Sequence, residues 1–146
     1  MREAIHIDGK GQQAIGRLAA ASALGIIRKR KPMKGLLPLT VTAEGCQVLI
    51  RFHVPHAPLI LDTVNVRKVP NYGFSVVMQD GLNKVQSVSV GDSTVILTCS
   101  QPVVEGCRIR YAVNGVTGKS GRTNGPRGNL RDVQNHWCYQ FEESIR

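Results

Sequence analysis

The sequence predicts an all-β protein of the jelly-roll or β-sandwich class, preceded by one N-terminal helix. From residue 41 onward, short segments rich in β-branched and aromatic residues recur at intervals of about 8–12 residues, and turn-forming residues separate them. A stretch near the N-terminus has helical periodicity instead. With 146 residues, the chain is long enough for one ordinary domain and one appended element.

The helix is expected over residues 9–27, where apolar side chains recur at helical spacing. The basic residues 28–31 follow at its C-terminal end, where positive charge complements the helix dipole, and Pro32 then ends it. We therefore divide the chain into a helical segment with a basic linker, residues 1–31, and a β module, residues 32–146.

Seven or more strands are expected after the helix. They fall within residues 41–54 (two runs around Gly45), 60–68, 73–79, 85–90, 94–99, 108–113 and 135–141. Turn residues mark positions 70–73, 80–81, 91–92 and 105–106. Residues 115–132 form a long, polar, glycine-rich stretch, which we expect to be an ordered loop clamped by the last strand.

Composition excludes several classes of function. The net charge is +9, but eleven of the nineteen basic residues lie in two groups, five within residues 28–34 and six between Arg108 and Arg131, and the second group carries no regular basic helix. We therefore expect no nucleic-acid partner. No apolar run is long enough to span a membrane, and the N-terminus lacks the layout of a signal peptide. We expect any export to be directed by a segment outside this sequence.

The sequence also lacks a complete catalytic or metal centre. No Gly-x-Ser-x-Gly or Gly-Asp-Ser nucleophile motif is present, and no pair of carboxylates is placed for acid–base work. The four cysteines form no Cys-x-x-Cys pair, so neither a metal site nor a cofactor is expected. Cys99 and Cys107 flank a turn, and both a disulfide and two free buried thiols remain open.

The first residues resemble the end of an SGNH-type hydrolase domain. There, an Asp-x-x-His block supplies the catalytic acid and base, and a helix that closes the domain follows. His6 matches the histidine of that block, whereas Glu3 stands where the family has aspartate. The resemblance implies that His6 is a remnant general base whose serine lies outside this sequence. The chain is therefore expected not to be an enzyme by itself.

Most of residues 40–142 resemble the modules attached to phage and prophage SGNH esterases. The matching blocks are residues 58–63, 71–74, 110–112 and 125–132. Such esterases include the prophage-encoded sialate O-acetylesterases of enteric bacteria, whose C-terminal part is a lectin-like jelly roll. The resemblance implies a carbohydrate-binding module for sialylated or mucin-type glycans, joined to an upstream esterase domain and released from a bacterial host to act extracellularly.

A sugar site requires planar donors for hydroxyl or carboxylate groups and an aromatic face for the ring. The candidate carbohydrate-binding residues are Tyr72, Arg122, Asn124, Arg127, Asn129, Arg131 and Trp137. Trp137 is also suited to the core, and Arg131 with Asp132 is also suited to pinning the loop by an internal ion pair. Two alternative functions stay open. One is a docking or oligomerisation module of the esterase or tail protein, which would form a homo-oligomer. The other is nucleic-acid binding.

Overall fold

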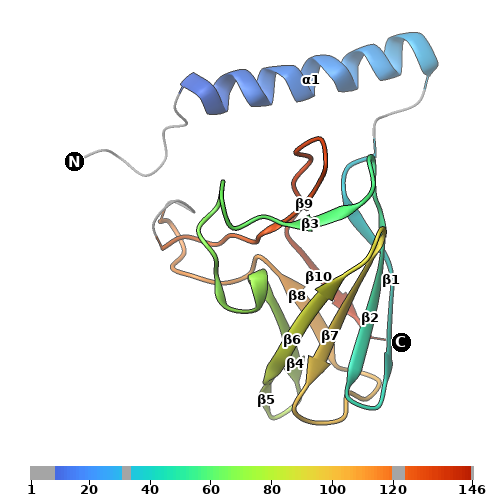
Figure 1. Cartoon of the computed structure of the whole chain (residues 1–146), viewed down its shortest axis with the longest axis vertical. Helices are drawn as coiled ribbons and strands as arrows, with labels where there is room; N and C mark the ends of the chain where they lie inside the picture. The colour runs from blue at the N-terminus through green and yellow to red at the C-terminus, as the bar shows by residue number, and fades with distance from the viewer. Residues whose placement is uncertain (1–8, 31–33, 120–123, 146) are drawn as a thin grey trace.

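The computed structural model describes residues 9–30, 34–119 and 124–145. Within them, one helix precedes a series of short antiparallel strands (Figure 1). In chain order the elements are α1 (Gly9–Lys29), β1 (Leu37–Glu44), β2 (Gln47–His53), β3 (Leu59–Leu61), the 3-10 turn η1 (Pro70–Gly73), β4 (Phe74–Met78), β5 (Gly81–Asn83), β6 (Val85–Val90), β7 (Thr94–Cys99), β8 (Arg108–Tyr111), β9 (Leu130–Asp132) and β10 (Phe141–Ser144). The prediction of a mostly β protein with an N-terminal helix is confirmed.

Two four-stranded sheets form the body of the module (Figure 1). Their strand orders are β1-β2-β7-β6 and β10-β8-β4-β5. Alternate residues of each strand face inward, so that Val48 and Ile50 of β2 are fully buried, as are Leu97 of β7 and Ile109 of β8. Because inward side chains from both sheets belong to one cluster, the hydrophobic core lies between the sheets.

A third, two-stranded sheet joins two distant parts of the chain. It pairs β3 with β9, so that Leu59 lies opposite Asp132 and Leu61 opposite Leu130. On the other side of β9, the Cys138 N–H donates to the Leu130 carbonyl (3.0 Å). The end of the long loop is therefore clamped by β3 as well as by the chain's final segment.

The predicted strand over residues 60–68 is wrong beyond Leu61. Asp62 turns the chain, because its Oδ1 atom accepts hydrogen bonds from the backbone N–H groups of Val64 and Asn65, both at 2.8 Å. The side chain of Val64 is 94% exposed, and this β-branched residue lies outside any strand despite its strand propensity. The remainder of this segment is a loop.

Two other predicted strands end at different places. β8 stops at Tyr111 because Ala112 has a positive φ of 58°. Residues 135–140 form no strand, and β10 (Phe141–Ser144) follows them. Asn135 has a φ of 65°, which is incompatible with an extended strand.

The four cysteine thiols are free. Cys99 ends β7 in one sheet, whereas Cys107 precedes β8 in the other. The two residues therefore do not face each other across a hairpin, although both are buried in the core.

Tyr111 connects the core to the long loop. Its ring lies 4.7 Å from that of Phe74 and 5.6 Å from that of Phe141, measured between centroids. Its hydroxyl oxygen accepts a hydrogen bond from the Leu130 N–H at 2.8 Å, and burial raises the pKa of this hydroxyl. A side chain at Gly128 would overlap the Tyr111 ring, so the loop requires glycine there.

Replacing Tyr111 with phenylalanine is expected to lower the free energy of unfolding by about 1–2 kcal/mol. The ring contacts are kept, but the buried Leu130 N–H loses its acceptor. Urea denaturation measures the change. Tyr139→Phe is the matched control, because Tyr139 is 59% exposed and should change the free energy by less than about 0.5 kcal/mol. Equal effects of the two substitutions would contradict the prediction.

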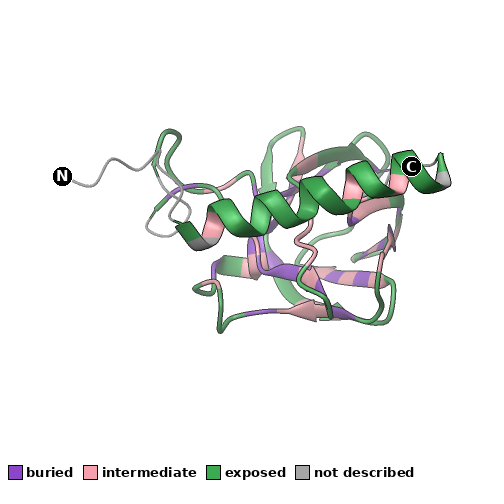
Figure 2. Ribbon diagram, turned by 90° about the horizontal axis from the view of Figure 1, so that it is seen from above, coloured by how far each residue is buried: buried purple, intermediate pink, exposed green. Residues whose placement is uncertain are grey.

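Helix α1 lies across one end of the module and exposes most of its surface (Figures 1 and 2). It extends two residues beyond the predicted end, and the Arg30 N–H donates to the Ile26 carbonyl. Its large apolar side chains remain exposed, up to 76% for Ile27. Among the described residues, no helix has both the length and the hydropathy needed to cross a membrane.

Candidate functional site

Tyr72 lies in the turn η1, directly before β4. Asn71 and Tyr72 both adopt left-handed backbone angles, with φ of 50° and 54°. Backbone hydrogen bonds hold this conformation, because the Tyr72 N–H donates to the Val69 carbonyl and the Tyr72 carbonyl accepts from the Asn129 N–H, both at 3.0 Å. The turn presents the Tyr72 ring half-buried at the module surface.

A depression of about 280 Å³ adjoins this ring. It is lined by Lys68, Asn71, Tyr72, Gln86, Ser87 and Val88. The Lys68 ammonium lies 4.8 Å from the centroid of the Tyr72 ring, at cation–π distance. The depression thus combines an aromatic face, a cation, two amides and a hydroxyl. We call it the Tyr72 depression.

The edge strand β6 supplies one wall of the Tyr72 depression. The pairing of β6 with β7 shifts register between Val85 and Ser87. As a result, Gln86 and Ser87 are both exposed, although they are consecutive residues of a strand. The imperfect alternation at residues 85–90 is the sequence signal for this wall. Lys68, Asn71, Gln86 and Ser87 were all missed as site residues.

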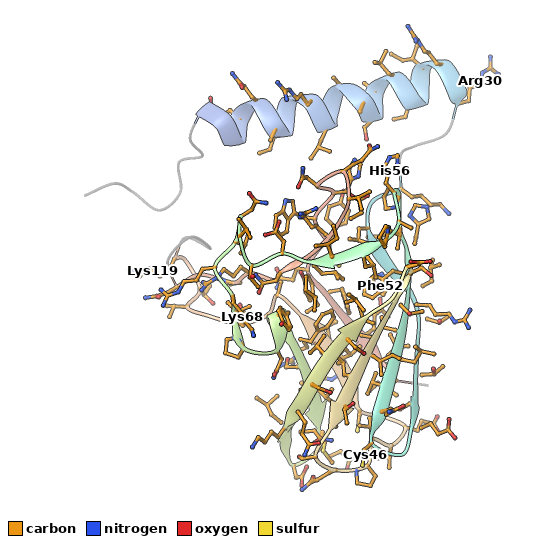
Figure 3. All side chains as sticks on the ribbon, viewed as in Figure 1. Arg30, Cys46, Phe52, His56, Lys68 and Lys119 are labelled. Atoms are coloured by element: carbon orange, nitrogen blue, oxygen red, sulfur yellow. The ribbon has the colours of Figure 1, made fainter. Side chains whose placement is uncertain are left out.

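Arg127 and Asn124 lie on the long loop. The Asn114 side chain holds the Arg127 backbone, donating to its carbonyl (2.8 Å) and accepting from its N–H (2.9 Å). The Arg127 guanidinium is half-buried and donates to the carbonyls of Arg67 and Gly125. Asn124 is exposed. Arg127 therefore stands beside the segment that precedes Tyr72, and Figure 3 shows Lys68 and Lys119 on this same side of the module.

Asn129 has a structural position, because it is fully buried. Its Oδ1 accepts from the Val69 N–H (3.1 Å), and its Nδ2 donates to the carbonyls of Asp62 (2.8 Å) and Val66 (3.0 Å). It has no exposed atom to offer a ligand. Its side chain fixes the loop between β3 and η1, and so positions the Tyr72 depression from behind.

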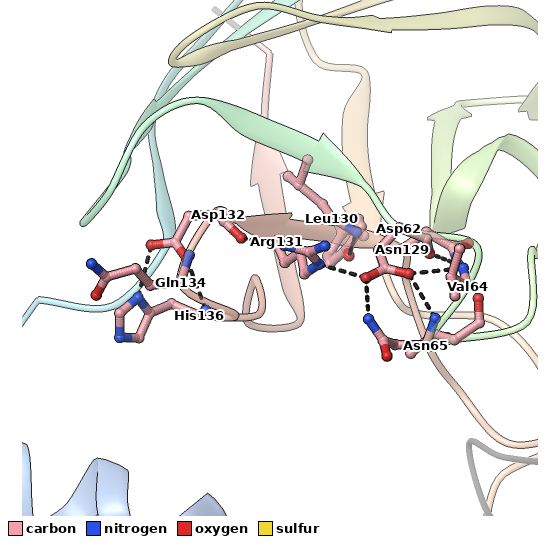
Figure 4. A network of polar contacts seen from close by, with 11 residues as sticks. Asp62, Val64, Asn65, Asn129, Leu130, Arg131, Asp132, Gln134 and His136 are labelled. Carbon is pink, nitrogen blue, oxygen red and sulfur yellow. Dashed lines mark hydrogen bonds and ion pairs between the residues drawn. The ribbon is translucent and has the colours of Figure 1, made fainter.

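Arg131 is bound by an internal ion pair. Its Nε donates to Asp62 Oδ2 (2.5 Å), and its Nη1 donates to the backbone carbonyl of Asp132 (Figure 4). The predicted pinning of the loop is thus present, but the carboxylate belongs to Asp62 rather than to Asp132. Although burial opposes it, hydrogen bonds from Arg131 and Asn65 hold the pKa of Asp62 well below its usual range.

Asp132 organises a second cluster (Figure 4). Its side chain is fully buried and accepts four hydrogen bonds: from the N–H groups of His56, Gln134 and His136, and from Nδ1 of His136 at 2.7 Å. The rings of His56 and His136 stack at 5.3 Å. Although burial opposes it, the hydrogen bonds from His136 and Gln134 lower the pKa of Asp132.

Trp137 lies away from the Tyr72 depression. It is half-buried, forms an isolated bridge with Arg131, and lines a mostly apolar depression of about 240 Å³. The other walls include Leu18 of α1, Tyr139 and His136. Trp137 therefore faces the helix instead of joining the other predicted site residues.

Two predicted residues, His6 and Arg122, lie outside the described residues. Of the others, Tyr72 lines the depression, Arg127 contacts the Arg67 carbonyl beside it, and Asn129 holds the Val69 N–H behind it. Arg131 instead pairs with Asp62, Asn124 is exposed, and Trp137 faces α1. Among residues 9–30, 34–119 and 124–145, no group of three or more His, Cys, Asp or Glu side chains is arranged to hold a metal ion.

No protein-family model and no curated protein matches the sequence. Among solved structures, the crystal structure of a carbohydrate acetylesterase from Xanthomonas citri resembles this chain with a TM-score of 0.62 at 14% identity. The likeness shows the fold alone. It covers 91% of this chain and 28% of the acetylesterase chain. Because residues 34–146 make up only 113 of the 146 residues, the shared region also includes part of the segment that holds α1.

Proposed function

We propose that this chain is a non-catalytic carbohydrate-binding module, a lectin-like β-sandwich of the jelly-roll class. It is the C-terminal part of a prophage-encoded sialate O-acetylesterase and acts outside the bacterial host. The likeness to part of a longer carbohydrate acetylesterase supports this proposal. By holding the esterase on a multivalent mucin surface, the module raises the effective concentration of the catalytic domain.

The Tyr72 depression is the observation that carries the proposal. The apolar face of a sugar ring packs on Tyr72, while Asn71, Gln86 and Ser87 hydrogen-bond its hydroxyl groups. Lys68 pairs with the carboxylate of a sialic acid.

Isothermal titration with sialyllactose tests the proposal. Tyr72→Ala is expected to weaken binding by about tenfold, because the stacking face is lost. Tyr72→Phe should keep most of the affinity. Tyr139→Ala is the matched control, since Tyr139 is an exposed tyrosine outside the depression. No binding of the unaltered chain at millimolar sugar would overturn the proposal, as would equal losses in Tyr72→Ala and Tyr139→Ala.

The charge of Lys68 gives a second, sharper comparison. Lys68→Gln keeps a polar chain but removes the cation, so it should weaken sialyllactose binding more than lactose binding. An equal loss for both sugars would contradict the pairing of Lys68 with the carboxylate.

The exposed apolar side chains of α1 favour a second candidate, a docking or oligomerisation module. Ile15, Leu24, Ile26 and Ile27 are each at least half exposed. Light scattering distinguishes the two candidates: a monomer at micromolar concentration favours the carbohydrate-binding module, and a stable dimer or trimer favours docking through α1.

A further inference from the structure

Three of the four cysteines converge at the end of the module opposite α1, where Figure 3 labels Cys46. Cys46 lies in the turn between β1 and β2, Cys99 ends β7, and Cys107 precedes β8. Burial, together with the neighbouring thiols of Cys46 and Cys107, raises the pKa of the Cys99 thiol. The thiols of Cys46 and Cys107 are therefore close enough to Cys99 to affect its ionisation.

Cys46 and Cys99 occupy the same rung of one sheet. The ladder of β2 and β7 pairs Val48 with Leu97 and Gln47 with Thr98, so Cys46 and Cys99 come next. The Cys99 N–H donates to the Cys46 carbonyl at 2.8 Å, which continues the ladder to this rung. Opposed residues of antiparallel strands have Cα atoms about 4.5–5.5 Å apart, within the range of about 4.4–6.8 Å that a disulfide requires.

The two side chains also face the same way. In β7, Val95, Leu97 and Cys99 are buried in alternation, and in β2 the buried residues are Val48, Ile50 and Phe52. Cys46 shares the parity of the buried residues of β2, and it is half-buried whereas the adjacent Gln47 is exposed. Both thiols therefore point toward the interior, and Cys46 is the one that solvent reaches.

Cys107 belongs to the other sheet. The Val103 N–H donates to the Gly45 carbonyl, which brings this segment to the β1–β2 turn, and the Ile145 N–H donates to the Cys107 carbonyl. In the register of β8 and β10, Cys107 lies opposite Ile145, and it is not opposed to Cys99 in the ladder of β2 and β7. Geometry thus favours Cys46, not Cys107, as the partner of Cys99.

We propose that Cys46 and Cys99 form a cross-strand disulfide when the chain meets an oxidising low-molecular-weight disulfide. The Cys46 thiolate attacks one sulfur of oxidised glutathione, forming a mixed disulfide and releasing one glutathione thiolate. Cys99 then loses its proton to water and attacks the Cys46 sulfur, displacing the second glutathione. Two protein thiols are oxidised by two electrons, and one glutathione disulfide is reduced to two thiols.

The disulfide would staple the β1–β2 turn to the end of β7, closing a loop between residues 46 and 99. Closing a loop of this length in the unfolded chain is expected to raise the Tm by roughly 5–15 °C. The proposal is independent of carbohydrate binding, because the Tyr72 depression does not include these residues.

The test incubates the full chain with oxidised glutathione, alkylates the remaining thiols and maps the peptides by mass spectrometry. The expected product has lost the mass of two hydrogen atoms and keeps two alkylated cysteines. After trypsin digestion, the disulfide should link the peptide of residues 35–51 to that of residues 85–108. Further cleavage after Glu105 separates Cys99 from Cys107 and should leave Cys99 linked to Cys46. A Cys99–Cys107 or Cys46–Cys107 link, or four alkylated thiols, would overturn the proposal.

Variants separate the disulfide from a general effect of oxidation. Cys46→Ser is expected to abolish both the link and the rise in Tm. Cys107→Ala and Cys138→Ala should retain both, with Cys138 as the matched control because it lies beside β9 and not in the cluster. Loss of the link in Cys107→Ala with its retention in Cys46→Ser would assign the disulfide to Cys99 and Cys107 and refute the proposed pair.

Discussion

Replacing Asn129 with leucine is expected to lower the free energy of unfolding by about 3–5 kcal/mol. Leucine has nearly the same shape but no polar atoms, so the Val69 N–H loses its acceptor, and the carbonyls of Asp62 and Val66 lose their donor. Each buried polar group left without a partner costs about 1–3 kcal/mol. The total is a large part of the stability of an ordinary domain.

Urea denaturation monitored by circular dichroism measures this change. Asn124→Leu is the matched control, because Asn124 lies on the same loop but is exposed, and it should alter the free energy by less than about 0.5 kcal/mol. If Asn129→Leu were as stable as Asn124→Leu, Asn129 would not be the residue that holds the loop before η1. Affinity at the proposed sugar site should also fall in Asn129→Leu, since the loop before η1 carries Lys68.

Replacing Asp132 with asparagine is expected to destabilise the protein by about 3–5 kcal/mol at neutral pH. The two carboxylate oxygens accept four N–H donors, and an amide offers one oxygen in their place. At least one donor then faces an NH₂ group in the interior. The substitution should loosen the segment around His136, which the carboxylate holds through two of its four bonds.

The effect of Asp132→Asn should depend on pH in a defined direction. The folded protein lowers the pKa of Asp132, so the carboxylate stabilises the fold above the unfolded-state value of about 3.9. This stabilisation is lost as the pH falls through the lower, folded-state value. The loss of unfolding free energy caused by Asp132→Asn should therefore be constant near pH 7 and shrink below about pH 4.

Urea denaturation at intervals from pH 7 to pH 3 measures this dependence, with Asp92→Asn, at an exposed carboxylate, as the control. A deficit that stays unchanged across this range would contradict a stabilising role for the charge of Asp132. The unaltered protein should lose stability in acid as well, since the pKa of Asp62 is lowered in the same direction.

Most strands of the two large sheets could be predicted because their signals are local, but β5 begins where only a turn was expected and β10 begins where the last predicted strand ends. Alternation and turn residues locate β6 and β7 to the residue, and β4 and β8 to within two. The segment after Leu61 could not be predicted, because its valines have strand propensity while a single carboxylate, Asp62, turns the backbone. Local patterns could not predict which strands share a sheet, because strand pairing depends on contacts between residues that are distant in the sequence.

The candidate site was predictable only in part, for a related reason. Tyr72 was found because a Pro-Asn-Tyr-Gly turn presents its third residue at the surface. Asn129 and Arg131 have the residue types of sugar ligands, but residue type does not say which way an amide or a guanidinium faces. In this fold both face inward, toward Asp62. The wall formed by Gln86 and Ser87 arises from a register shift, and the imperfect alternation at residues 85–90 signals the irregularity without showing which side chains it exposes.

That register shift in β6 has a further consequence for how copies of the module coexist. β6 is an outer strand of its sheet, and a regular outer strand offers unpaired backbone groups on which a second chain can add itself. A bulge interrupts the regular spacing of these backbone groups and twists the strand, so a neighbouring copy finds no continuous edge with which to pair. Copies of the module at high local concentration would therefore resist edge-to-edge aggregation, protected by the same distortion that exposes Gln86 and Ser87 at the Tyr72 depression.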